Sequence, residues 1–194
     1  MQVEFLSWRD AGWQAAAALI EEHFARVHGA RITLPAIRLA VAVAANGALL
    51  GAAGIRDHRQ GFFSQAYLDR PIADEIEART GADVRPTDLI EVVSMACPAP
   101  NATLPLIDAI TARGRHEGRS WGVFTATGPL MRLLRRTGAP LVPLARALPE
   151  RIGIAADWGR YYQTDPWVCA LHDRAAGLRF MPRPAGAAAR AALT

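Results

Sequence analysis

The chain has 194 residues, 51% of them hydrophobic, and its 22 basic and 18 acidic residues give a formal charge of +4. This length and apolar content suffice for one well-packed domain but hardly for two, and so modest a charge gives no reason to expect a nucleic-acid partner. Every basic residue is arginine, which cannot lose a proton to act as a base but can pair with carboxylates and phosphates. A compositional bias, shared with the abundant alanine, explains the arginine content equally well.

Alternating apolar residues predict strands, and apolar residues at helical spacing predict helices between them. Ser7 or Asp10 can cap the first helix, and Asp69 can cap the second. Residues 142–154 contain two prolines and are expected to form a loop with a short helix. In chain order the predicted elements are a strand 2–6, a helix 11–27, a hairpin 37–55, a helix 72–80, a strand 88–97, a helix 103–114, a strand 120–126, a helix 129–137 and a strand 167–171.

The longest stretch without charge, residues 39–55, approaches the length of a membrane span. Asn46-Gly47 lies at its centre between alternating apolar residues, which instead predicts a hairpin with a two-residue turn. No basic segment followed by an apolar one opens the sequence, so a secretory signal is not expected. Cys97 and Cys169 fall in predicted strands and form no disulfide or metal framework. These features predict a cytoplasmic protein without a metal site or stable membrane insertion.

The segment from Asp88 to Gly138 is the centre of the predicted fold. Its two apolar runs are rich in β-branched and aromatic residues and flank a helical segment, which predicts neighbouring parallel strands. With the other elements they give an α/β fold, a mixed twisted sheet with helices on both faces in a single domain over residues 1–180. Residues 181–194 have no periodic apolar face and are expected to form a mobile tail.

Glu91 lies in the middle of an apolar strand, where a carboxylate is costly unless it is paired or functional. Desolvation would raise its pKa, which suits a general base that deprotonates an amine. The structural alternative is an ion pair with Arg56 at the end of the adjacent strand. Arg56 is itself a catalytic candidate because ligands often meet a sheet at its strand ends, although a solvated turn fits the sequence as well.

Four short motifs occur in order along the chain: FFSQAYLDRPI at residues 62–72, IEVVSMA at 90–96, WGVFTAT at 121–127 and WGRYY at 158–162. Together they resemble the motifs of the thermostable hemolysin family, over roughly residues 28–168. That family is similar in fold to acyl-homoserine-lactone synthases and, more distantly, to GNAT-type N-acyltransferases. The resemblance implies a GNAT-like sheet in which the pantetheine arm of an acyl donor enters between two splayed central strands.

The chain departs from the family pattern in two places. Where the family has Glu-Gln before Tyr-Leu-Asp, this chain has Gln65-Ala66, and where the family has Gly-Asn-Leu after Glu-Val, it has residues 93–95, Val-Ser-Met. Losing the glutamate removes one possible acid or base, so the acceptor or the chemistry can differ from that of typical members. The matching residues to which a role carries over are Glu91, Tyr67 and Asp69.

The resemblance also implies an acyl thioester, on phosphopantetheine or coenzyme A, as co-substrate, with no tightly bound cofactor. Hydroxyl groups on the central strands can bond the amides of the pantetheine arm, and aromatic residues of the WGRYY motif can line an acyl site or pack beneath the last strand. Tyr67 and Asp69 can place a substrate or close a lid. The expected substrate-binding residues are Gln65, Tyr67, Asp69, Ser94, Thr125, Thr127, Trp158 and Tyr162.

The turn at residues 97–103 stands where GNAT enzymes bind the pyrophosphate of coenzyme A through free backbone N–H groups. It has no glycine, and its two prolines remove donors, which favours an acyl group presented on a carrier protein. Arg132, Arg135 and Arg136 are expected to face solvent from an amphipathic helix and to attract an acidic acyl-carrier protein. An ordinary solvated helix surface is the alternative.

The sequence thus favours an acyltransferase that moves an acyl group from a carrier protein or coenzyme A to a small amine, with Glu91 and Arg56 as catalytic candidates. A non-catalytic acyl-binding module and a membrane-active protein, as the family's name suggests, remain open. A lytic protein should carry an exposed amphipathic or spanning segment, and none is evident. Acyl chain, acceptor and oligomeric state are not specified.

Overall fold

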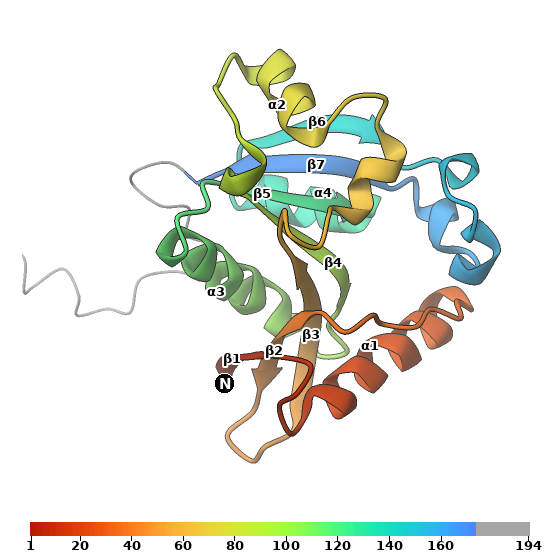
Figure 1. Ribbon diagram of the computed structural model, residues 1–194. Helices are drawn as coiled ribbons and strands as arrows, with labels where there is room; N and C mark the ends of the chain where they lie inside the picture. Colours follow the sequence, from red (N-terminus) through yellow and green to blue (C-terminus); the bar gives the residue numbers. More distant parts are fainter. Residues whose placement is uncertain (174–194) are drawn as a thin grey trace, which may run out of the picture.

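The two predicted parallel strands, β4 (Leu89–Ala96) and β5 (Trp121–Ala126), lie side by side at the centre of a seven-stranded sheet (Figure 1). This computed structural model describes residues 1–173, so the predicted tail at 181–194 lies outside the described residues. The other strands are β1 (Gln2–Leu6), β2 (Arg38–Val43), β3 (Leu49–Arg56), β6 (Leu141–Arg146) and β7 (Trp167–His172). Their order is β1-β2-β3-β4-β5-β7-β6, and β4 with β5 is the parallel pair while the other neighbours are antiparallel.

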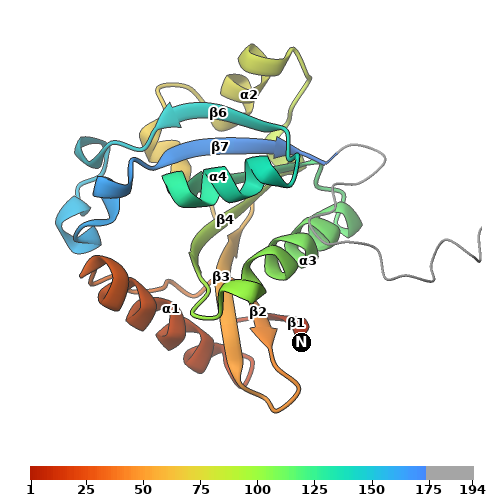
Figure 2. The same cartoon turned by 180° about the vertical axis from the view of Figure 1, so that it is seen from behind.

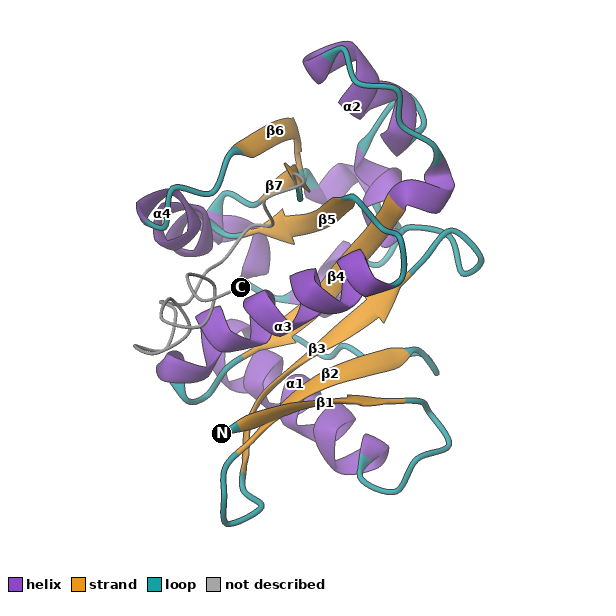
Figure 3. Ribbon diagram, turned by 90° about the vertical axis from the view of Figure 1, so that its left-hand side faces the viewer, coloured by secondary structure: helices purple, strands orange, loops and turns teal. Residues whose placement is uncertain are grey.

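Four α-helices cover the two faces of this sheet. α3 (Thr103–His116) connects β4 to β5 and lies with α4 (Gly128–Arg136) on one face, which Figure 2 shows in front. α1 (Trp13–His28) and α2 (Ile72–Thr80) lie on the opposite face, and Figure 3 shows the sheet from the side. The predicted mixed α/β fold, with helices on both faces and a parallel β4–β5 pair, is confirmed.

Two apolar clusters lie between the sheet and the helices α1 and α2. One packs α1 through Ile20 and Phe24 against β2 and β3, and the other packs Ile72 and Ile76 of α2 against β5 and β7. Burial of such side chains contributes about 1.5–3 kcal/mol each. Phe63, Ile152 and Tyr162 pack against both clusters and connect them.

The parallel strands separate in the middle of the sheet. Pairing of β4 with β5 ends at Val92 and Phe124, although both strands continue. Directly after this point Ser94 has a φ of 48°, and β4 carries one residue more than β3 between the pairs Gly54–Val93 and Ala52–Ala96. A bulge of this kind bends its strand, and here it turns β4 away from β5. The splayed central strands that the resemblance implied are therefore present.

The predicted side-chain caps of α1 and α2 are absent. Neither Ser7 nor Asp10 caps α1, because Gly12 precedes the helix with a φ of 96° and Asp10 Oδ2 accepts a hydrogen bond from the Ser7 N–H at 2.7 Å. Asp69 does not cap α2, because Pro71 occupies the position before the helix without any side-chain cap.

The hairpin turn is one residue longer than predicted. Ala44 N–H donates to Ala48 O at 2.8 Å and Gly47 N–H donates to Ala44 O at 2.9 Å, so the loop is 45–47 rather than Asn46-Gly47 alone. Gly47 closes it with a φ of 84°, the left-handed conformation that three-residue hairpin loops require.

Residues 142–154 were expected to be a loop, yet β6 lies there as an edge strand paired with β7. Pro143 lies inside β6, and the register shifts between Pro143 and Ala145. Proline is tolerated in edge strands because one side of the strand needs no donor. The short helix expected in this segment is present at Pro149–Arg151.

Candidate active site

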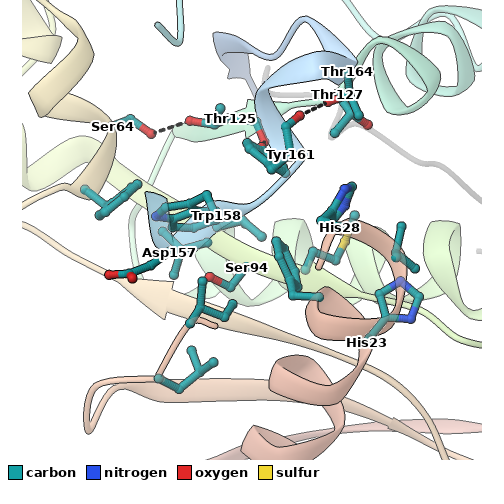
Figure 4. Close-up of a pocket in the computed structure, with 18 of the residues that line it drawn as sticks. His23, His28, Ser64, Ser94, Thr125, Thr127, Asp157, Trp158, Tyr161 and Thr164 are labelled. Atoms are coloured by element: carbon teal, nitrogen blue, oxygen red, sulfur yellow. Dashed lines mark hydrogen bonds between the residues drawn. The ribbon is translucent and has the colours of Figure 1, made fainter. Parts of the chain in front are cut away.

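A cavity of about 790 Å³ opens on the face that carries α1, against the separated ends of β4 and β5. Its walls come from the end of α1, the loop around Phe63–Tyr67, the start of α4 and residues 154–164 (Figure 4). This volume lies within the range of about 300–1,000 Å³ typical of small-molecule sites. Of the predicted site residues, the cavity brings together Arg56, Tyr67, Ser94, Thr125, Thr127 and Trp158.

A smaller cavity of about 80 Å³ lies on the opposite face, beneath α3 and α4. Both cavities share Val92, Ser94, Met95, Thr125 and Leu130 in their walls. These residues flank the place where β4 leaves β5, so the two cavities approach each other from opposite faces of the sheet at this point.

Glu91 is completely buried on β4, and both of its carboxylate oxygens accept backbone hydrogen bonds. Phe63 N–H donates to Oε2 and Ser64 N–H donates to Oε1, each at 2.7 Å. Burial raises the pKa of Glu91, while these hydrogen bonds and the charge of Arg56 oppose the rise. Glu91 is not one of the described residues that line the cavity. The geometry thus gives Glu91 the role of an anchor for the loop and does not support its assignment as a general base.

Arg56 faces Glu91 in the register of β3 and β4, but no ion pair between these two residues occurs in the described part of the chain. Its Nη2 donates to Gln60 O at 2.8 Å, and its buried Nε has no hydrogen-bond partner among residues 1–173. The predicted ion pair is therefore wrong, and Arg56 instead contributes a positive charge to the cavity wall.

The side chain of Gln65 is used within its own loop. Gln65 Oε1 accepts from the Ile72 N–H at 2.9 Å, and Nε2 donates to Arg70 O at 2.8 Å. Both ends of the Gln65 side-chain amide are therefore used to connect the loop to the start of α2. This geometry does not support the predicted contact of Gln65 with a substrate. Ser64 supports the same loop from the other side, where its Oγ lies 3.0 Å from Thr125 Oγ1 (Figure 4).

Tyr67 and Tyr162 meet through their hydroxyl groups, 2.7 Å apart. Burial raises the pKa of both phenols, and for Tyr67 the hydrogen bond with Tyr162 adds to the rise. Tyr67 lines the cavity, whereas Tyr162 lies behind it and Tyr161 takes the place on the wall that the sequence assigned to its neighbour. Asp69 lies far outside on the surface, where its carboxylate pairs with Arg151 at 2.6 Å with 79% of the side chain exposed. The geometry therefore does not support the predicted substrate roles of Tyr162 and Asp69.

The outer wall of the cavity is fastened to the end of α1 by backbone contacts. Arg160 N–H donates to His28 O at 2.8 Å, and Arg31 N–H donates to Asp157 O at 2.6 Å. Gly159 fits between them with a φ of 53°, and a Cβ there would lie 2.3 Å from His28 O. The WGRYY motif therefore needs its glycine to bring Trp158 and Tyr161 onto the wall.

Sequence reasoning missed the part of the site that α1 contributes. His23, His28 and Asp157 all line the cavity, and the ring of His28 packs edge-on against Tyr161 with centroids 5.3 Å apart. Burial lowers the pKa of both histidines, helped by Arg26 at His23 and by His23 and Arg160 at His28. Nothing in the local pattern of α1 marks these histidines, because the packing of α1 on the distant segment at 157–161 makes them part of the site.

The cysteines are free thiols. Cys169 is fully buried, which raises its pKa to about 12, and burial likewise raises the pKa of Cys97 on the cavity wall. Within residues 1–173 no group of histidine, cysteine and acidic side chains could hold a metal ion. None of the described helices is long and apolar enough to cross a membrane.

Arg132, Arg135 and Arg136 are exposed on α4, while Met131 and Leu134 of the same helix are buried. None of the ion pairs among the described residues involves these three arginines, so they present unneutralised charge. The helix begins at the cavity, since Thr127 before it lines the wall.

The sheet with its opening between β4 and β5 defines a GNAT-like fold of the acyl-homoserine-lactone-synthase type. The acyl-homoserine-lactone synthase LasI superposes with a TM-score of 0.60 at 11% identity, over 94% of this chain and 98% of that one. FeeM, an N-acyl amino acid synthase from uncultured soil microbes, superposes with a TM-score of 0.58 at 16% identity, over 89% of this chain and 95% of that one. BjaI, a coenzyme A-dependent acyl-homoserine-lactone synthase, superposes with a TM-score of 0.55 at 12% identity, over 90% of this chain and 84% of that one.

The chain belongs to the thermostable hemolysin family, whose model matches residues 7–176. Among proteins with curated descriptions, none matches this chain in sequence. The suspected family and its structural relationship to acyl-homoserine-lactone synthases are therefore confirmed.

Proposed function

We propose that this protein is an acyltransferase that moves an acyl group from a pantetheine thioester to a small amine. The observation that carries the proposal is the separation of β4 from β5, where the large cavity and a smaller apolar cavity on the opposite face share wall residues. An extended donor arm fits such an opening, and its reactive end would meet an acceptor in the wider space. The family membership and the fold shared with LasI, FeeM and BjaI support the same reaction class.

The residues on the two sides of the opening suit the two substrates. Ser94 and Thr125 offer hydroxyl groups to the amides of the donor arm, next to the apolar side chains Val92 and Met95. Arg56 places a positive charge on the wall, where it can stabilise a developing oxyanion or hold a carboxylate of the acceptor. No tightly bound cofactor is required by this chemistry.

The donor is proposed to be presented on an acidic acyl-carrier protein. The turn before α3 holds Pro98 and Pro100, and Pro105 follows in the first turn of the helix, so three backbone donors that could bind a pyrophosphate are missing. The three exposed arginines of α4 follow Thr127, Pro129 and Leu130, which line the cavity, and a cationic helix face beside it would orient an acidic partner.

Product analysis tests the proposed reaction. The protein is incubated with octanoyl-pantetheine, octanoyl-coenzyme A or octanoyl-carrier protein together with a panel of amino acids and simple amines. Mass spectrometry is expected to reveal an N-octanoyl amide and release of the free thiol. Tight binding of the donors without any amide would favour a non-catalytic binding module, and leakage of dye from lipid vesicles without amide formation would favour a membrane-active protein.

Reversing the charge at Arg132, Arg135 and Arg136 to glutamate is expected to raise KM for the carrier-bound donor by at least about tenfold and to leave KM for octanoyl-pantetheine unchanged. Added salt should weaken the use of the carrier-bound donor by the wild-type protein in the same way, because it screens exposed charges. Arg9→Glu combined with Arg59→Glu serves as a control with reversed charges at two other exposed positions. Equal losses with both donors would mean that the α4 arginines support the fold rather than a partner.

A further inference from the structure

The proposed reaction needs a group that accepts the proton of the attacking amine, and the anchoring role of Glu91 leaves that group to be found elsewhere. The arginines of the cavity wall cannot accept a proton. Burial raises the pKa values of Tyr67, Tyr161 and Cys97, so these groups remain protonated at neutral pH. The described groups of the cavity wall that can accept a proton are His23, His28 and Asp157.

Contacts within the wall separate these three candidates. Nδ1 of His23 already lies 3.1 Å from Arg26 Nη2, which occupies its lone pair. Asp157 is an exposed carboxylate, and its negative charge suits it to attract an ammonium group. No described residue forms a hydrogen bond with the ring of His28, whose nitrogen lone pair is therefore available.

The surroundings of His28 hold its ring in a defined position. It lies in the last turn of α1, where Phe24 packs at a centroid distance of 5.5 Å and Tyr161 at 5.3 Å. Its backbone oxygen is fixed by Arg160 N–H at 2.8 Å. Figure 4 shows the ring between the side chains of Thr127 and His23, on the cavity side of the helix.

We infer that His28 is the general base of the reaction and accepts the proton from the amine as it attacks the thioester. This inference rests on the proposed acyl transfer. The amine nitrogen bonds to the carbonyl carbon, and its proton passes to the imidazole of His28. The C–S bond then breaks, the thiolate leaves with the bonding electrons, and the imidazolium returns the proton to the sulfur. The products are an amide and a free thiol.

Charges around His28 keep it in the form that this role requires. Arg160 on the facing turn is a cationic neighbour, and His23 on the same helix opposes a positive charge on His28. Arg31 and Asp157 lie on the adjacent wall, and Tyr161 is a neutral phenol. Burial, then His23, then Arg160 lower the pKa of His28, so its neutral form prevails at neutral pH. Turnover should therefore fall as the pH decreases through a value below the ordinary histidine pKa of about 6.5.

The test compares His28→Gln and His28→Ala with wild type and with His116→Gln, which removes an exposed histidine at the end of α3. With octanoyl-pantetheine and the best amine of the panel, both His28 variants should lose turnover by at least about 100-fold. They should also lose the acidic limb of the pH profile, and added imidazole should restore part of the activity of His28→Ala. His116→Gln should behave as wild type, and circular dichroism should show all variants folded.

If wild-type protein turns over and His28→Gln is fully active, the assignment of His28 is overturned and the acyl transfer stands. The same conclusion follows if the His28 variants keep the acidic limb of the pH profile. Absence of any amide product with wild-type protein would overturn the acyl transfer and the role of His28 with it. Loss of activity in His28→Ala without rescue by imidazole and without a change in the pH profile would assign His28 a packing role instead.

Discussion

Gly159→Ala is expected to lower the free energy of unfolding by about 3 kcal/mol or more and to abolish ligand binding in the cavity. The new Cβ would lie 2.3 Å from His28 O and 2.8 Å from backbone atoms of Gly29, which no rotation of a side chain can relieve. The φ of 53° adds backbone strain for any residue with a Cβ. Because this contact fastens Trp158 and Tyr161 to the end of α1, the wall of the cavity would separate from the helix.

Urea denaturation followed by circular dichroism measures this effect. Gly153→Ala is the matched control, since Gly153 lies in the same segment without a positive φ, and a Cβ added there would have no atom within 4 Å. It should change stability little. Wild-type stability of Gly159→Ala would show that residues 157–160 do not pack against the end of α1 in this way.

Glu91→Gln is expected to lower the free energy of unfolding by about 1–3 kcal/mol, the cost of leaving a buried donor without an acceptor. The carboxylate accepts from Phe63 and Ser64, whereas an amide offers one acceptor and turns a second donor toward an N–H group. The substitution also removes a buried charge, which by itself would raise the free energy of unfolding. The balance of the two effects decides where in the range of about 1–3 kcal/mol the loss of stability falls. The loop that carries Tyr67 should become looser, so turnover should fall as well.

Amide hydrogen exchange at Phe63 and Ser64 reports the loop directly, and both amides should exchange faster in Glu91→Gln. Glu22→Gln, on the exposed side of α1, is the control. The pH profile separates anchoring from catalysis: an anchor leaves the acidic limb in place at reduced turnover. A protected loop combined with loss of the acidic limb would instead restore Glu91 as the base.

Local pattern was sufficient to predict the centre of the fold. The β-branched runs at β4 and β5, on either side of a helical segment, have few arrangements other than a parallel pair joined by a crossover helix. The pattern failed where tertiary context decides. Pro143 made β6 resemble a loop, because sequence alone does not reveal that this strand lies at an edge. Asp69 resembled a cap, yet Arg151, which lies far along the chain, takes its carboxylate.

The candidate site was predicted only in part for the same reason. Ser94 and Thr125 were found because polar residues in buried strands are unusual. Glu91 was found by the same signal, but sequence could not show that both of its oxygens bind backbone N–H groups of a loop 27 and 28 residues away. His28 gives no local signal, since it joins the site through the contact between α1 and Gly159.

The proposed donor site is tested most directly by a crystal structure of the protein with S-octyl-pantetheine, a thioether that cannot transfer its alkyl chain. We expect the pantetheine arm to lie between β4 and β5 in contact with Ser94 and Thr125. We also expect the sulfur to face the cavity bounded by His28 and Tyr161. An arm bound on another surface, with the opening between the two strands unoccupied, would contradict the proposed donor site.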